Sequence, residues 1–338
     1  MKTESRKCSS NMFRENKNWL IAFALLLLAY PLVGHLEPYT VQIILLCGIN
    51  IILATSLNLV NGFTGQFSMG HAGFMSVGAY TSATITTVLF PSLFSSASGS
   101  YLFIFPLLLG GLVACFMGFL VGLPSLRLRG DYLSIVTLGF GEIIRVLMQT
   151  TDFVGASRGL PGIPPLAGFG WIYGSILVTL FVLWRIINSR YGRSFIAVRE
   201  DEIAAEAMGV PTTKTKVRAF MVGAFFAGIA GALFAHLIQI VTPSIFDFNK
   251  SFEIIMIIVF GGLGSLSGSV VAAIFLTILK EKLRGLQEFT FGYDLRMIIY
   301  SFLLIVLMLS RPEGLMGRKE ISAFLKKFFN KNKEAVQS

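Results

Sequence analysis

Long apolar runs are the feature that most constrains the fold of this chain. They recur from Trp19 to Ser310, and a helix needs about 20 mostly apolar residues to cross a bilayer. The sequence has room for roughly eight to ten such helices. Only 14% of its residues are charged, whereas soluble domains carry about 25%. We therefore expect an all-α fold, a polytopic transmembrane helical bundle with about ten spans.

The basic residues indicate which side of the membrane each segment faces. The formal net charge is +10, but Lys and Arg gather in the two tails and in short loops, a pattern typical of cytoplasmic segments and not of a nucleic-acid surface. We expect residues 1–18 and 311–338 to be cytoplasmic tails and residues 19–310 to form the transmembrane domain. Both termini then lie in the cytoplasm, and the chain contacts the lipid bilayer and no nucleic acid.

Most spans follow directly from the apolar runs. The expected helices lie at 19–36, 39–60, 66–90, 102–123, 132–150, 171–187, 217–241 and 297–309. The run at 252–279 is ambiguous, because glycines interrupt it at 261–268. One helix there gives nine spans and termini on opposite sides, whereas a break gives ten spans and both termini inside. The two basic tails favour ten, although Lys280, Lys282 and Arg284 then lie outside.

Two of the expected spans carry a stripe of small residues. Residues four apart lie on one helix face, and small side chains let neighbouring helices approach closely in membranes. We expect both stripes to be packing surfaces in preference to pore lining. They comprise Gly110, Ala114, Gly118 and Gly122 in one span and Gly223, Ala227, Gly231 and Ala235 in the other.

Glu142 and Arg145 are charged residues inside an expected span. Ionisable groups at membrane depth are costly and face the protein interior, and a spacing of three residues allows a helical ion pair. We expect an intramembrane ion pair with a structural role, in preference to a substrate site. No cluster of His, Cys and carboxylates in the sequence predicts a metal site.

The longest polar segment between spans, 188–216, contains a short stretch with the composition of a helix. Glu202, Ala204 and Ala205 favour a helix, Gly209 can end it, and Pro211 follows. The chain has no Gly-x-x-x-x-Gly-Lys-Ser/Thr phosphate-binding motif and no catalytic cluster. A membrane enzyme or assembly factor is therefore disfavoured, and a transport subunit that takes energy from a partner is favoured. On this local pattern alone, a solvated amphipathic helix stays an equal alternative.

Several blocks in a fixed order resemble the permeases of branched-chain amino acid ABC importers. The blocks lie at 58–80, 126–145 and 159–164, followed by Phe260-Gly-Gly-Leu-Gly-Ser-Leu-Ser-Gly268 and Arg311-Pro-Glu-Gly314. The resemblance is to the M-type subunit of a two-permease system, and it covers residues 40–315. The segment around 197–210 resembles the coupling helix of such permeases, although Ile203 stands where that pattern has Glu.

The resemblance implies the rest of an importer. We expect a homologous H-type permease, two ABC ATPase subunits that bind ATP and Mg, and an extracytoplasmic substrate-binding protein. This chain then binds no cofactor itself and lies in the bacterial plasma (inner) membrane. Leucine, isoleucine and valine are the expected substrates, with urea or short amides as the alternative. The coupling residues are Glu202, Ala204, Ala205 and Gly209.

Weakly polar side chains at the start of the third expected span are candidates for the translocation path. Small residues there permit an irregular helix start where a cavity needs one. For His71, a hydrogen-bonded interior position is the stronger expectation. The candidates are Asn61, Thr64, Gln66, Ser68, His71 and Ser76.

Overall fold

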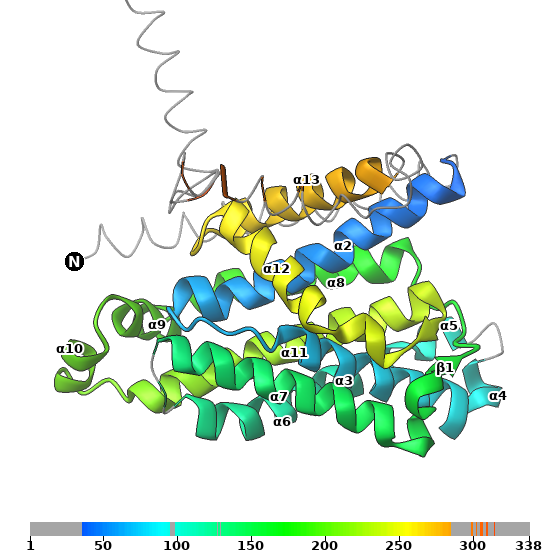
Figure 1. Ribbon diagram of the computed structural model, residues 1–338, viewed down its shortest axis with the longest axis horizontal. Coiled ribbons are helices and arrows are strands. Elements are labelled where there is room, and N and C mark those ends of the chain that lie inside the picture. Colours follow the sequence, from blue (N-terminus) through cyan, green and yellow to red (C-terminus); the bar gives the residue numbers. More distant parts are fainter. Residues whose placement is uncertain are drawn as a thin grey trace, which may run out of the picture.

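The computed structural model describes residues 36–94, 99–126, 128 and 130–284, and the isolated positions 299, 302, 305, 306, 309 and 314. The expected tails, the expected first helix at 19–36 and the expected last helix at 297–309 therefore lie wholly or almost wholly outside the described residues. Within the described part, helices predominate and lie side by side along the long axis of the molecule (Figure 1).

Within the described residues, eight long helices form the bundle. They are α2 (Pro38–Asn58), α3 (His71–Thr84), α6 (Ile104–Ser125), α7 (Asp131–Thr150), α8 (Phe169–Ile187), α11 (Thr212–Ile238), α12 (Phe248–Gly261) and α13 (Leu266–Arg284). Two π-helical segments, η1 (Leu59–Phe63) and η2 (Ile85–Leu89), extend α2 and α3. In the part of the chain that the structure describes, five segments are long and apolar enough to cross a membrane: Pro38–Phe63, Ile104–Ser125, Asp131–Thr150, Phe169–Ile187 and Thr212–Ile238.

Short elements lie at the two ends of the bundle, which we name after them (Figure 1). The α10 end carries α9 (Arg190–Glu200) and α10 (Glu202–Ala207). The β1 end carries the remaining short elements. These are α4 (Pro91–Phe94), α5 (Gly99–Leu102), η3 (Asp152–Val154), η4 (Ala156–Arg158), η5 (Pro243–Phe246) and an antiparallel pair of two-residue strands, β1 (Leu160–Pro161) and β2 (Ile240–Val241).

The core of the bundle is α11 packed against α3 and α6. A methyl group at Gly110 would lie 2.9 Å from the carbonyl oxygen of Gly78, and one at Gly118 would lie 2.6 Å from the Cβ of Ala224. A methyl group at Gly231 would overlap the carbonyl oxygen of Met75. The remaining stripe positions also lie in this core: Ala114, Ala227 and Ala235 are fully buried, Gly122 faces Phe220, and Gly223 faces Val60. The helices thus approach so closely that no side chain fits between them.

The glycine-rich stretch after α12 breaks the chain into two helices, as the sequence indicated. Gly262 and Gly264 have φ angles of +109° and +87°, a region that L side chains rarely adopt. Gly261 and Gly268 then face each other so closely that α12 and α13 form a tight hairpin. At 14 residues α12 is about 21 Å long, shorter than a hydrocarbon core of about 30 Å. The total of ten spans and the cytoplasmic termini stay predictions, since they depend on residues outside the described part.

Candidate functional site

The segment at the α10 end folds as two short helices. Asp201 lies between them, and its Oδ1 accepts hydrogen bonds from the backbone N–H groups of Ile203 and Ala204, at 2.8 and 3.0 Å. Such a side-chain cap satisfies the free N–H groups at a helix start. Gly209 follows α10 with a φ of +82°. The sequence predicted only this second helix; α9 was missed, although Phe195 and Val198 supply buried apolar positions three residues apart.

The two faces of α10 differ in exposure. Ala204 and Gly209 are exposed, whereas Ala205 is 6% exposed and packs against its own chain. The expected contact of these residues with an ATPase stays a prediction. The side chains that project are Ile203 and Met208, at 69% and 84% exposure. An exposed apolar pair on an ordered helix is a surface suited to a protein partner.

An ion pair fixes α10 to the transmembrane core. Glu202 Oε1 lies 2.7 Å from the Nζ of Lys216 in α11, and the Lys216 side chain is buried. Since a buried charge needs its partner, this ion pair holds α10 against the start of α11.

Arg199, at the end of α9, connects the same segment to two helix breaks. One break is η1, at the end of α2, and the other is the turn between α12 and α13. Its Nη1 donates to the carbonyl of Gly62 in η1 at 3.1 Å, and a methyl group at Gly264 would lie 3.1 Å from that nitrogen. Asn58 holds the two breaks together: its Oδ1 accepts from the Gly264 N–H at 2.9 Å, and its Nδ2 donates to Ser269 Oγ at 2.7 Å. Sequence reasoning did not single out Arg199 or Asn58, because these partners are backbone groups and one serine that lie far away in the sequence.

The six polar candidates for the translocation path are all buried. Asn61 and Ser68 exchange two hydrogen bonds across the extended segment between η1 and α3. His71 Nε2 lies 2.9 Å from Ser56 Oγ, which agrees with an interior histidine. Thr64 and Ser76 donate to nearby backbone carbonyls.

Gln66 differs from the other candidates. Among the described residues, neither its Oε1 nor its Nε2 has a hydrogen-bond partner, although both are buried. A pocket of about 530 Å³ lies at the β1 end between α2, α8 and α13, but none of the six candidates lines it. Their assignment to a path therefore stays a prediction.

Two groups of charged residues lie on α7, α12 and α13 in the described part of the chain. Arg145 Nε and Glu142 Oε2 are 2.6 Å apart on α7, and both side chains are partly exposed. A second group, Lys250, Glu253 and Lys280, was not recognised from the sequence, which placed Lys280 outside the membrane. The available signal was Lys250 and Glu253, spaced three apart at the start of an apolar run.

Long apolar helices around a glycine-packed core, two interrupted helices and an ordered helical segment at one end define a polytopic membrane permease. The chain belongs to the family of branched-chain amino acid transport system permease components, which matches residues 39–308.

Known relatives include two kinds of permease. The chain is 34% identical to the high-affinity branched-chain amino acid transport permease LivM of Escherichia coli, over 89% of this chain and 75% of that protein. It is 24% identical to a probable LivM of Methanocaldococcus jannaschii, over 83% of this chain and 94% of the relative. It is also 23% identical to LivH of E. coli, over 80% of this chain and 92% of that protein. No solved structure matches the chain.

Proposed function

We propose that this chain is the M-type permease subunit of an ABC importer that carries leucine, isoleucine and valine across the bacterial plasma membrane by alternating access. The observation that carries the proposal is the match to LivM, named as a high-affinity branched-chain amino acid permease, over 89% of this chain. The similarity extends through the whole glycine-packed core and both interrupted helices, since the family match runs over residues 39–308.

The partners follow from the same proposal. A homologous H-type permease completes the membrane pathway, and its relative LivH also resembles this chain. Two ABC ATPases bind ATP and Mg and supply the energy. They dock at the α10 end, which is then cytoplasmic, and the exposed Ile203 and Met208 are the contact. A substrate-binding protein delivers the amino acid to the β1 end.

Uptake by whole cells tests the substrate. In a strain without a redundant importer, deletion of the gene removes uptake of labelled leucine and leaves urea uptake unchanged, and the restored gene returns leucine uptake. Unchanged leucine uptake contradicts the proposal. Loss of urea uptake alone indicates an importer of urea or short amides.

A further inference from the structure

Two neighbouring helices, α6 and α7, present different outer surfaces. They pack against each other, and each has a face that the rest of the described chain leaves open. Large apolar side chains cover the outer face of α6, and no Lys, Arg, Asp or Glu occurs along its 22 residues. Such a face is well matched to lipid tails, which are as apolar as leucine. The outer face of α7 differs, because an ion pair and an open glycine lie on it.

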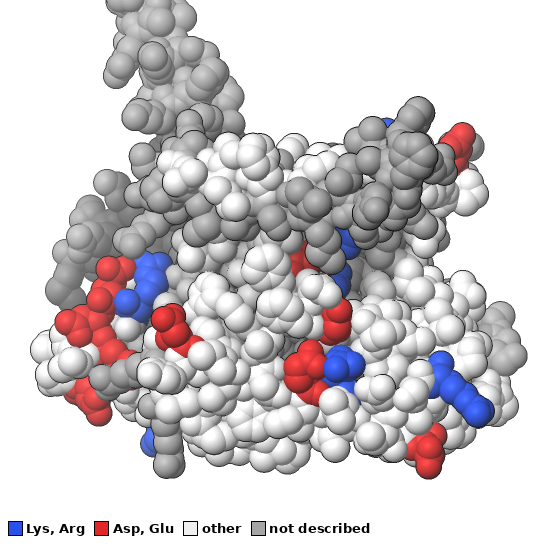
Figure 2. All heavy atoms as spheres, viewed as in Figure 1, with Lys and Arg blue, Asp and Glu red and all other residues white. Residues whose placement is uncertain are grey.

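The ion pair of Glu142 and Arg145 lies near the middle of α7. Glu142 follows the start of this helix by 11 residues, or about 17 Å, and precedes its end by eight residues, or about 12 Å. The 20 residues of α7 match a hydrocarbon core about 30 Å thick, and α7 packs against η4 and η5 at the β1 end. Figure 2 shows acidic and basic atoms side by side over the middle of α7, away from both ends of the bundle.

Both side chains of this pair are partly open to the outside. Glu142 is 36% exposed and Arg145 is 27% exposed. Charged groups at this depth are costly against lipid, and they almost always face protein or a water-filled cavity. The outer face of α7 therefore meets something other than lipid at its middle.

Gly139 lies on the same face, one turn before the ion pair. It is exposed, and a methyl group added to it would meet no atom within 4 Å. Its small size therefore serves no packing within the described chain, unlike that of Gly141, whose added methyl group would lie 3.4 Å from Gly70. Small residues on a helix surface allow a second helix to approach closely in the membrane. An open glycine beside an exposed ion pair is thus a surface for a helix of another subunit.

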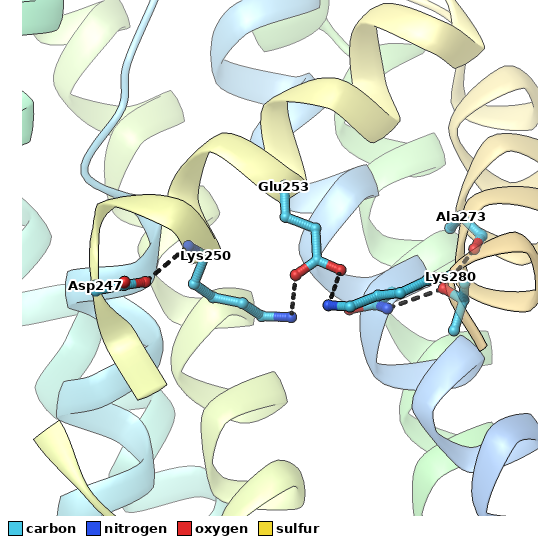
Figure 3. A network of polar contacts seen from close by, with 7 residues as sticks. Asp247, Lys250, Glu253, Ala273 and Lys280 are labelled. Carbon is cyan, nitrogen blue, oxygen red and sulfur yellow. Dashed lines mark hydrogen bonds and ion pairs between the residues drawn. The ribbon is translucent and has the colours of Figure 1, made fainter. Parts of the chain in front are cut away.

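The other charged group, Lys250, Glu253 and Lys280, gives no such indication. Glu253 points between the two lysines (Figure 3). The carboxylate of Asp247 accepts from the backbone N–H of Lys250 and supplies a second negative charge. Lys250 follows η5 at the start of α12, toward the β1 end. Long charged side chains near a helix end can reach the membrane surface, so this group requires no protein partner.

We propose that the outer face of α7 is where this permease binds its homologous permease partner. The inference rests on the proposed function, in which the H-type permease is that partner. LivM and LivH of E. coli are similar to this chain over 89% and 80% of its length, so two permeases of this kind can pair about a pseudo-two-fold axis. Like faces meet at such an axis, and the acid and base of each subunit can then pair with groups of opposite sign on the other. The face comprises Ile135, Gly139, Glu142, Ile143, Arg145 and Val146.

Photo-crosslinking identifies what covers each helix. The photo-reactive amino acid p-benzoylphenylalanine replaces either Ile143 in α7 or Phe116 in α6, in the complete importer in native membranes. The two positions are a matched pair, because they are 54% and 59% exposed and each follows the start of its helix by 12 residues. We expect position 143 to give an adduct with the homologous permease and position 116 to give none. The inference is overturned by a lipid adduct alone at 143, by an adduct of two copies of this chain there, or by the same permease adduct from both positions.

Gly139→Leu tests the close approach of the partner. Since nothing in the described chain lies near the added side chain's first atom, the variant should accumulate in the membrane like the wild type. Gly174→Leu in α8 is the matched control, because a methyl group there also meets no atom within 4 Å. We expect Gly139→Leu to lower the amount of homologous permease that co-purifies with this chain at least about fivefold, and Gly174→Leu to leave it unchanged.

Unchanged co-purification with Gly139→Leu overturns the inference, and so does an equal loss in both variants. If Gly139→Leu fails to accumulate, the crosslinks from positions 143 and 116 decide alone. A wild-type chain that co-purifies with no homologous permease contradicts the proposed function, independently of either variant.

Discussion

At the scale of single residues, glycines set the distance between helices. Gly78, Gly110 and Gly231 lie where α3, α6 and α11 meet backbone to backbone. Small residues replace the hydrophobic effect as the source of packing between helices in lipid, because they allow close van der Waals contact. The structure therefore depends on the absence of side chains at these positions.

The first prediction concerns Gly231. Gly231→Ala places a methyl group against the carbonyl oxygen of Met75, and such overpacking typically costs about 1–3 kcal/mol. The expected result is a lower melting temperature of the purified permease assembly in detergent. The control is Gly174→Ala in α8, where no atom lies within 4 Å of the added methyl group. Equal melting temperatures for the two variants would show that the contact between α11 and α3 accommodates the methyl group with no loss of stability.

A second residue-scale prediction concerns Gly209. Its φ of +82° is a conformation that β-branched residues resist, although open space surrounds it. Gly209→Val therefore strains the end of α10 without a steric clash. We expect the importer to assemble normally in the membrane but to lose substrate-stimulated ATP hydrolysis. Normal stimulation in the assembled variant would refute this role for Gly209.

At the scale of elements, α9 connects α10 to the interrupted helices. Arg199 touches both η1 and the turn between α12 and α13, and Asn58 ties these two breaks to each other. A displacement of α9 therefore reaches both breaks through one side chain. The two breaks lie on α2 and α12–α13, which pack together.

The third prediction tests this link. Arg199→Gln shortens the side chain and removes the hydrogen bond to Gly62, so α9 can move without the interrupted helices. We expect ATP hydrolysis to continue while leucine import falls at least fivefold. Arg193→Gln, exposed on the same helix, serves as the control and should transport normally. Parallel loss of hydrolysis and import in Arg199→Gln would point instead to failed docking of the ATPase.

The sequence predicts elements better than it predicts contacts between them. Apolar length located α2, α6, α7 and α8 to within a few residues, and the glycines located the break before α13. Helix α9 escaped notice because its charged residues mark it as polar loop. The group of Lys250, Glu253 and Lys280 escaped notice because Lys280 and Glu253 are 27 residues apart, and only the hairpin brings them together.

At the scale of the whole molecule, the arrangement fixes which segments share a side of the membrane. The hydrogen bond from Tyr39 Oη to Glu281 Oε1 places the start of α2 and the end of α13 at the same end of the bundle. Helix α10 lies at the opposite end (Figure 1). Residues near 208 and 282 should therefore face opposite sides of the membrane.

The fourth prediction concerns the orientation of the chain in the membrane. Single cysteines are introduced at Ser5, Met208, Lys282 and Asn330 after Cys8, Cys47 and Cys115 have been replaced by Ser. A membrane-impermeant thiol reagent should label intact cells at position 282 alone, and the other three positions should react only after lysis. Labelling of position 330 from outside, with position 5 protected, would instead support nine spans.

The short, charged helix α12 also has a consequence for biosynthesis. A Lys or an Asp at the centre of an inserting helix costs about 2.5–3.5 kcal/mol, and α12 carries a Lys and a Glu within its first six residues. Lys280, the lysine nearer to Glu253, is translated later, so α12 lacks one of its two ion pairs while it is the last segment made. We expect the ribosome-bound chain to hold α12 at the translocon until α13 emerges, and the two helices to enter the bilayer as one hairpin. Truncation of the chain at Gly264 should then leave α12 outside the membrane, accessible to added protease.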